Sequence, residues 1–195
     1  MVKRRSRRQS NLVNYLLLLI LLGLLFCLVF PFFKQQEKQE PQTEVRKEFI
    51  ARIAPLAQAE QRKYRIKASI TIAQAALESD WGQSQLASKY NNLFGVKGNE
   101  QDGTLLATKE YVNGQWITVE DYFVVYPSWK AAVEAHSKLF VDGTGWDHNH
   151  YQAVLEASDY KQAAQALQER GYATDPNYAA KLIELIEQYQ LDSYD

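Results

Sequence analysis

The stretch ITIAQAALESDWG, residues 70–82, constrains the fold most, because it predicts an apolar helix that ends in acid. Glu78 and Asp80 follow the alanines, and Gly82 then favours the end of the helix. An apolar helix of this kind is typical of the centre of a domain, where a buried carboxylate is costly unless it is paired or protonated. Its spaced apolar residues share one face: Ile70, Ala73, Leu77 and Trp81.

Glu78 is therefore the first candidate for catalysis. Burial at the end of this helix would raise the pKa of its carboxyl group toward working pH, which is the property that a general acid needs. The alternative is a carboxylate at a solvated helix end that has no catalytic role.

A second feature is the run from Tyr15 to Phe33, which carries no charge and nearly reaches the roughly 20 residues that a membrane helix needs. A basic cluster precedes it, so the positive-inside rule places the N-terminus in the cytoplasm. We expect a cytoplasmic segment 1–11, a transmembrane anchor 12–33, a polar linker 34–43 and an extracytoplasmic domain 44–195. A cleaved signal peptide is the alternative, but the run ends in bulky residues rather than small ones.

The predicted domain is acidic and lacks thiols. Five of the 22 basic residues precede the apolar run, so the remaining 17 face all 23 acidic ones. This balance argues against nucleic acid as a partner, because phosphates require a basic surface. Cys27 is the only cysteine and lies in the apolar run, which excludes disulfide and thiol chemistry from the domain. We expect a monomer that needs no cofactor.

The rest of the chain predicts helices and one hairpin. Residues 49–57 form a helical stripe that Pro55 interrupts or restarts. Residues 84–90 favour a short helix, and the asparagines and glycines of residues 91–98 favour a tight loop. Asn113-Gly114 predicts a hairpin turn between two strands. Further helices are expected over residues 128–140 and 159–170 and after residue 178, so the fold class is α+β and mainly α.

The three histidines of the chain give little indication of a metal site or of a catalytic role. His148 and His150 lie in a polar turn without a matched third metal ligand, so no metal site is expected. His136 lies on an apolar helix face, where a hydrogen-bonded core histidine is the simpler interpretation. The chain also contains no G-x-S-x-G motif and no P-loop.

Carboxylate side chains are the remaining candidates for catalytic groups. Glycosidic bond cleavage commonly uses one protonated carboxyl group and a second group that activates water or stabilises the cation. The hairpin offers Glu110, Glu120 and Asp121 for the second role. Strand alternation places Thr108, Glu110 and Val112 on one face. The alternative for Glu110 is a solvated strand carboxylate.

Five segments, in this order, resemble the bacterial endo-β-N-acetylglucosaminidases of glycoside hydrolase family 73: AALESDWG (75–82), NNLFGVK (91–97), TKEY (108–111), FVVYPSWK (123–130) and YATDPNY (172–178). The resemblance covers about residues 44–190. It implies a lysozyme-like fold, with a helical lobe, a small β-lobe and a groove for a glycan strand. It also implies hydrolysis of the β-1,4 bond between N-acetylglucosamine and N-acetylmuramic acid in peptidoglycan.

The same resemblance implies roles for single residues. Glu78 matches the general acid, and Glu110 matches the second acid on the β-lobe. Either Tyr172 or Tyr178 matches an aromatic position in the groove, and the sequence does not choose between them. Core packing is the alternative for the aromatic residues. Further residues are expected to shape the groove or bind sugar: Gln74, Trp81, Asn92 and Phe94.

Three questions stay open at the level of sequence. The second acid could activate water in an inverting reaction, or the N-acetyl group of the substrate could assist and leave Glu110 secondary. A muramidase or lytic transglycosylase of similar architecture would cut a different bond or release an anhydro product. A glycan-binding module without activity is the third possibility.

Overall fold

The computed structural model describes residues 42–112 and 115–195, without the side chains of residues 109–112 and 116. Contacts divide the chain into two units, Met1–Val45 and Arg46–Asp195, and the second forms the folded domain. The predicted anchor over residues 12–33 and the Asn113-Gly114 turn lie outside the described residues. Within them, no helix combines the length and the apolar character needed to cross a membrane.

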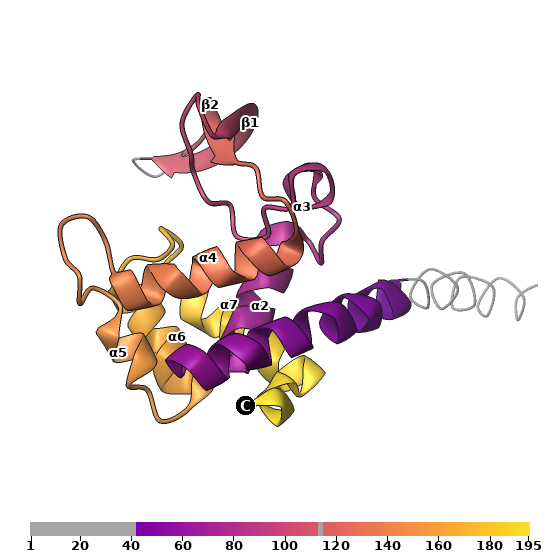
Figure 1. Ribbon diagram of the computed structural model, residues 1–195, viewed down its shortest axis with the longest axis vertical. Coiled ribbons are helices and arrows are strands. Elements are labelled where there is room, and N and C mark those ends of the chain that lie inside the picture. Colours follow the sequence, from indigo (N-terminus) through magenta and orange to yellow (C-terminus); the bar gives the residue numbers. More distant parts are fainter. Residues whose placement is uncertain (1–41, 113–114) are drawn as a thin grey trace, which may run out of the picture. The chain divides into compact units, whose positions relative to one another are not determined.

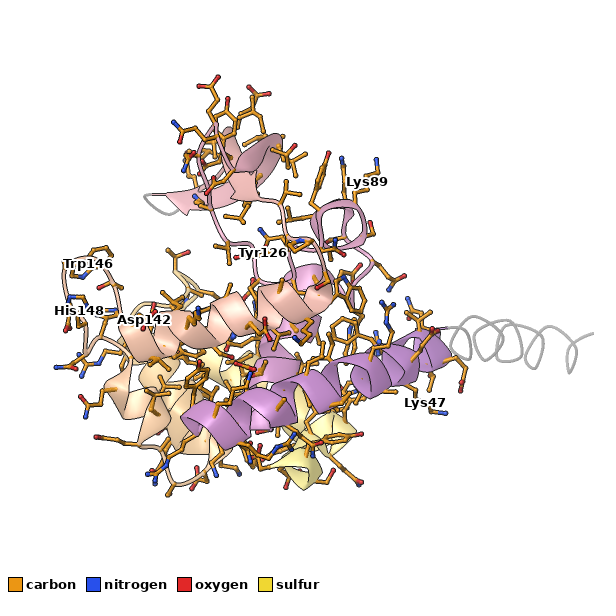
Figure 2. The ribbon with its side chains drawn as sticks, viewed as in Figure 1. Lys47, Lys89, Tyr126, Asp142, Trp146 and His148 are labelled. Atoms are coloured by element: carbon orange, nitrogen blue, oxygen red, sulfur yellow. The ribbon has the colours of Figure 1, made fainter. Side chains whose placement is uncertain are left out.

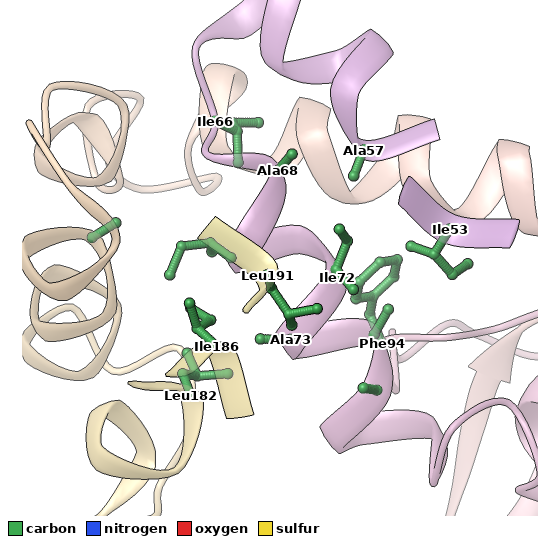
Figure 3. Close-up of a cluster of buried hydrophobic side chains, with 14 of the residues drawn as sticks. Ile53, Ala57, Ile66, Ala68, Ile72, Ala73, Phe94, Leu182, Ile186 and Leu191 are labelled. Carbon is green, nitrogen blue, oxygen red and sulfur yellow. The ribbon is translucent and has the colours of Figure 1, made fainter. Parts of the chain in front are cut away.

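Helix α2, Ala68–Ser79, is the centre of the domain, as predicted, and ten of its twelve residues are buried. Figure 3 shows Ile72 and Ala73 of α2 among side chains from other segments, including Ile53, Phe94 and Leu191. Full burial of an isoleucine stabilises a fold by roughly 1.5–3 kcal/mol. At the N-terminus of α2, the backbone N–H and hydroxyl of Ser69 donate to the Asp195 carboxylate at 2.8 and 2.9 Å.

A long helix over residues 42–64 packs on α2 and runs through Pro55 without a break. The sequence predicted an interruption there, because proline removes a backbone donor and crowds the preceding turn. Pro55 is exposed, whereas Ile53, Ala54 and Ala57 are buried around it. Burial of this apolar face offsets the lost hydrogen bond and keeps the helix continuous.

The β region is a two-stranded antiparallel hairpin, as predicted. Strand β1, Gly103–Val112, pairs with β2, Gln115–Val124, so that Thr108 lies opposite Val119 and Glu110 opposite Ile117. The hairpin is joined to the preceding loop by backbone bonds, from Gly98 N–H to Tyr122 O at 2.8 Å and from Val124 N–H to Val96 O at 3.0 Å. Figure 1 shows the hairpin standing above α4 on this loop.

The remaining helices surround α2. Polar side chains cap three of them at their N-termini, as the sequence pattern favours: Ser84 caps α3, Ser128 caps α4 and Asp159 caps α6. The bounds are α3 Gln85–Tyr90, α4 Trp129–Asp142, α5 Gln152–Leu155, α6 Tyr160–Glu169, α7 Tyr178–Tyr189 and the 3₁₀ helix η1 Leu191–Tyr194. The result is a mainly helical domain with one small sheet (Figure 1).

Candidate active site

A cleft of about 760 Å³ lies between the helices and the hairpin. Glu78, at the end of α2, forms part of its wall. The opposite wall comes from β1 and β2, through residues 106–108 and Phe123. The remaining lining residues are 84–86, 94–97, Leu139, Tyr151 and 172–174. We refer to this space as the cleft.

The turn after α2 places Glu78 at the last exposed position of the helix. The chain leaves the helix through three successive left-handed residues, Asp80, Trp81 and Gly82, with φ of 50°, 57° and 77°. A Cβ atom at Gly82 would lie 2.7 Å from the Trp129 ring, so only glycine fits there. The Ser79 hydroxyl closes the turn by accepting the Gly82 N–H at 2.7 Å.

Glu78 is the end of a hydrogen-bonded series that begins in the core. The amide nitrogen of buried Gln74 donates to the Tyr178 hydroxyl at 3.0 Å, and that hydroxyl donates to Oε1 of Glu78 at 2.9 Å. Tyr178 is only 2% exposed, so its hydroxyl cannot turn to water. The series fixes the direction of the single tyrosine proton and leaves Oε2 of Glu78 available to the cleft.

The environment of Glu78 is suited to proton transfer. Crowding by protein atoms removes water from its carboxyl group and raises its pKa above the ordinary value. The Tyr178 hydrogen bond and the charge of Lys181 oppose this shift without cancelling it. The side chain as a whole is still exposed, because one side of it opens into the cleft. A carboxyl group of this kind holds its proton to a higher pH than a solvated one.

Tyr172 and Tyr178, between which the sequence did not choose, take different positions. Tyr178 lies beneath Glu78, whereas Tyr172 lines the cleft and stacks on Tyr178 with ring centroids 5.7 Å apart. Burial raises the pKa of the Tyr172 hydroxyl well above its ordinary value, so it stays protonated. One tyrosine orients the carboxyl group, and the other presents its ring to the cleft.

Asn92 organises the loop that the sequence placed in the groove. Its side-chain nitrogen donates to Val96 O at 2.9 Å and to Val124 O at 3.0 Å, and its oxygen accepts the N–H of Val96 at 3.0 Å. The residue is 1% exposed, so its amide is used by the backbone and is not free to bind sugar. The neighbouring Phe94 does line the cleft, as expected.

His136 is a core residue, but its ring nitrogens lack the hydrogen bonds that the sequence led us to expect. Neither nitrogen has a partner within the described part of the chain. The ring stacks on Phe94 at 3.8 Å between centroids and meets Phe140 edge-on. Burial lowers the pKa of His136 to about 3, so the ring is neutral at physiological pH.

Trp81 lies in a different place from the one that the helical spacing predicted. Because α2 ends at Ser79, Trp81 lies beyond the helix whose apolar face was predicted to include it. It packs between Phe49 and Tyr189, with centroid distances of 5.9 and 4.7 Å, and it is not among the residues that line the cleft. This packing matches the alternative that the sequence left open for the aromatic residues.

Glu110 lies on β1, two residues beyond Thr108, which lines the cleft. Its side chain lies outside those that the structure describes. The other acidic residues of the hairpin differ: Glu120 is exposed, and Asp121 forms an ion pair with Lys97 at 2.8 Å. Glu110 remains the second candidate on the strand that faces Glu78.

Several cleft residues could not be found by sequence reasoning. Leu106, Leu139 and Tyr151 come from three separate segments, and none belongs to a local chemical motif. Their convergence is a property of the tertiary fold.

The histidine turn has a structural role. His150 Nε2 lies 2.8 Å from Arg170 O, and His148 Nδ1 lies 3.1 Å from Asp142 O. Across the described ranges, 42–112 and 115–195, no three acidic, histidine or cysteine side chains gather as a metal site.

Comparisons with known proteins agree on one family. Residues 54–191 match the sequence profile of the glucosaminidase family, described as mannosyl-glycoprotein endo-beta-N-acetylglucosaminidase. The exo-glucosaminidase LytG of Bacillus subtilis is 41% identical over the whole of this chain and 70% of its own length. A probable N-acetylmuramidase of Lactococcus lactis is 39% identical over 75% of this chain, which spans 34% of that protein.

A solved structure gives the same result. The catalytic domain of the autolysin Auto from Listeria monocytogenes superposes with a TM-score of 0.71 at 36% identity, covering 83% of this chain and 97% of that domain. The profile match extends over most of the described domain and includes Glu78, Tyr172 and Tyr178. The chain therefore belongs to the glucosaminidase family, glycoside hydrolase family 73, and is a glycoside hydrolase.

Proposed function

We propose that this protein hydrolyses the β-1,4 bond between N-acetylglucosamine and N-acetylmuramic acid in the glycan strands of peptidoglycan, with Glu78 as the general acid. The observation that carries the proposal is the Tyr178–Glu78 hydrogen bond at the wall of the cleft, on a carboxyl group whose pKa is raised. Membership of the glucosaminidase family gives the class of reaction. The similarity to the exo-glucosaminidase LytG and to the autolysin Auto supports it.

The acid step follows from the geometry at Glu78. With Oε1 held by Tyr178, the proton resides on Oε2, which is free to face the glycosidic oxygen in the cleft. Transfer of that proton to the leaving oxygen lets the C–O bond break without expelling an alkoxide. Once Glu78 is ionised, Tyr178 and Lys181 stabilise the carboxylate, since both lower its pKa. The same contacts thus favour the product of the proton transfer.

Glu110 is the second acid in this proposal and activates the attacking water. Thr108 of the same strand lines the cleft opposite Glu78, which supports this role. An inverting reaction needs the two carboxyl groups roughly 6.5–9.5 Å apart, with room for a water molecule. If the N-acetyl group of the substrate assists instead, loss of Glu110 will reduce activity only modestly, whereas loss of Glu78 will still abolish it.

Residues 12–33 anchor the domain in the membrane, with residues 1–11 in the cytoplasm and residues 44–195 outside it. The uncharged run and the basic cluster before it support this proposal. Cell fractionation with a protease-accessibility assay tests it. We expect the protein in the membrane fraction, with its C-terminal domain digested from the outer side. Recovery of the active protein in the culture medium would contradict the anchor.

A muramidase is the second candidate, and the similarity to a probable N-acetylmuramidase favours it. The two activities leave different sugars at the new reducing end of the cut strand. Product analysis therefore distinguishes them without any assumption about the fold.

The decisive experiment uses the full chain in detergent micelles with purified peptidoglycan. The wild type is compared with Glu78→Gln and Glu110→Gln, and the released fragments are reduced and weighed. We expect N-acetylglucosamine at the reducing ends and none of these fragments with Glu78→Gln. N-acetylmuramic acid ends would establish the muramidase. Full activity in Glu78→Gln would overturn the assignment of the acid.

A further inference from the structure

Trp146 is the most exposed large apolar side chain in the described part of the chain, with 82% of its surface open to solvent. It lies on the loop between α4 and α5, which Figure 2 shows projecting beyond Asp142 with Trp146 and His148 on it. An isolated exposed apolar residue often has no function. Trp146 differs from such residues because its loop is held in place.

Local contacts fix the conformation of this loop. Thr144 and Asp147 exchange two backbone hydrogen bonds of 2.9 and 3.2 Å. Gly143 has φ +71°, and a Cβ atom there would lie 2.4 Å from the carbonyl oxygens of Asp147 and His148, so the turn requires glycine. His150, bound to Arg170 O, meets the Trp146 ring edge-on at 6.1 Å. The indole is therefore presented to solvent by an ordered turn.

A continuous series of aromatic rings leads from this loop to the catalytic carboxyl group. His150 contacts Tyr151 at 4.7 Å between centroids, and Tyr151 contacts Tyr172 at 6.2 Å. Tyr172 stacks on Tyr178, which donates to Glu78. Tyr151 and Tyr172 both line the cleft, so the ring contacts of His150 with Trp146 and Tyr151 connect the Trp146 loop to the cleft wall.

We propose that Trp146 is a sugar-binding platform outside the cleft, on which a pyranose ring of the bound glycan strand stacks. The inference rests on the proposed function, since it needs a strand longer than the cleft itself. A pyranose ring presents a face of C–H groups that packs on an aromatic ring, and tryptophan offers the largest rigid area for such packing. A platform at one end gives the enzyme a preference for long strands.

Strand binding in a Glu78→Gln background, where no cleavage occurs, tests the platform. Calorimetry with the full chain in detergent micelles compares peptide-free tetrasaccharides with intact glycan strands. We expect Trp146→Ala to weaken binding of intact strands roughly tenfold and to leave tetrasaccharide binding unchanged. Trp146→Phe should restore most of the loss, because it retains a ring.

Leu105→Ala is the matched control, because Leu105 is also exposed but does not line the cleft. It should bind both substrates like the parent protein. Unchanged binding of intact strands by Trp146→Ala would overturn the platform, and so would an equal loss for both substrates, which would indicate a disturbed cleft. If the Glu78→Gln parent bound neither substrate and the wild type cut no peptidoglycan, the proposed function itself would fail.

Discussion

The Tyr178 hydroxyl donates a hydrogen bond of 2.9 Å to Oε1 of Glu78, a residue that precedes it by 100 positions in the chain. This contact joins the start of α7 to the end of α2 and sets the direction of the carboxyl group. It also lowers the pKa of Glu78 against the larger effect of burial, which raises it. Removal of this hydrogen bond should therefore affect both the orientation of the Glu78 carboxyl group and its pKa, and the two effects can be measured separately.

Tyr178→Phe should shift the pH dependence of the reaction. A general acid must be protonated, so the rate falls as pH rises through its pKa. Loss of the hydroxyl raises the pKa of Glu78, and the alkaline limb of kcat moves to higher pH, while kcat falls roughly tenfold from lost orientation. Rates on solubilised glycan strands across pH measure both effects.

Tyr160→Phe is the control for that experiment, because the Tyr160 hydroxyl donates to Glu187, on a different surface. Its profile should follow the wild type. An alkaline limb that stays in place in Tyr178→Phe would show that Glu78 does not set it.

Glu78→Gln should make the protein more stable at neutral pH. The folded carboxyl group has a raised pKa, so between the ordinary pKa and the raised one the folded state binds more protons than the unfolded state. Stability is lost as pH rises through this window, and glutamine removes that loss. We expect a higher Tm than wild type at pH 7 and equal Tm values below about pH 4.

Glu187→Gln should show the opposite sign. The Lys161 hydrogen bond lowers the pKa of Glu187, so this carboxylate stabilises the fold above its ordinary pKa and the contribution is lost as pH falls. Its Tm at pH 7 should equal or fall below that of wild type. A lower Tm for Glu78→Gln at pH 7 would contradict the burial argument.

Asn92→Ala should weaken the fold and the cleft together. The substitution removes three part-buried hydrogen bonds to backbone groups of Val96 and Val124, at a cost of about 3 kcal/mol in the free energy of unfolding. Urea denaturation measures this cost, and a raised KM should accompany it because Phe94 and Val96 line the cleft. Asn99→Ala, which removes one exposed hydrogen bond to Gln101 N, should change little.

His136→Phe should stabilise the protein, most of all in mild acid. The ring lies against Phe94 and Phe140, and removal of its two unpartnered nitrogens should gain about 1 kcal/mol at pH 7. The folded pKa is about 3 against an ordinary 6.5. The unfolded state therefore binds a proton in between, and wild-type stability falls as pH falls through this range.

Urea denaturation at pH 7 and pH 5 tests this dependence on pH, and His148→Phe at an exposed position is the control. The advantage of His136→Phe should grow at the lower pH. Parallel changes in the variant and the wild type would mean that His136 is protonated in the folded protein.

The parts of the site that sequence reasoning found are those with local signals. The apolar run with Glu78 predicted α2, and Asn113-Gly114 predicted the hairpin that bears Glu110. The predicted helical position of Trp81 was wrong, because the spacing of apolar residues continues past the left-handed residues that begin at Asp80. The spacing of apolar residues does not show that the backbone leaves the helix at Asp80, before Trp81.

The remaining differences come from tertiary structure. Pro55 stays helical because the burial of its neighbours offsets its missing hydrogen-bond donor. The side-chain amide of Asn92 is hydrogen-bonded to backbone groups that lie up to 32 residues away. The unpartnered nitrogens of His136 and the position of Tyr151 depend on how separate helices meet. None of these features leaves a trace in the neighbouring sequence.

The carboxylate of Asp195 binds the start of α2 at Ser69, 126 residues earlier in the chain. Synthesis runs from the N-terminus, and a contact between distant residues forms only after the later one is available. The helix that carries Glu78 therefore gains this contact only when residue 195 has emerged. During translation this support for the central helix therefore forms after the residues of the surrounding helices have been synthesised.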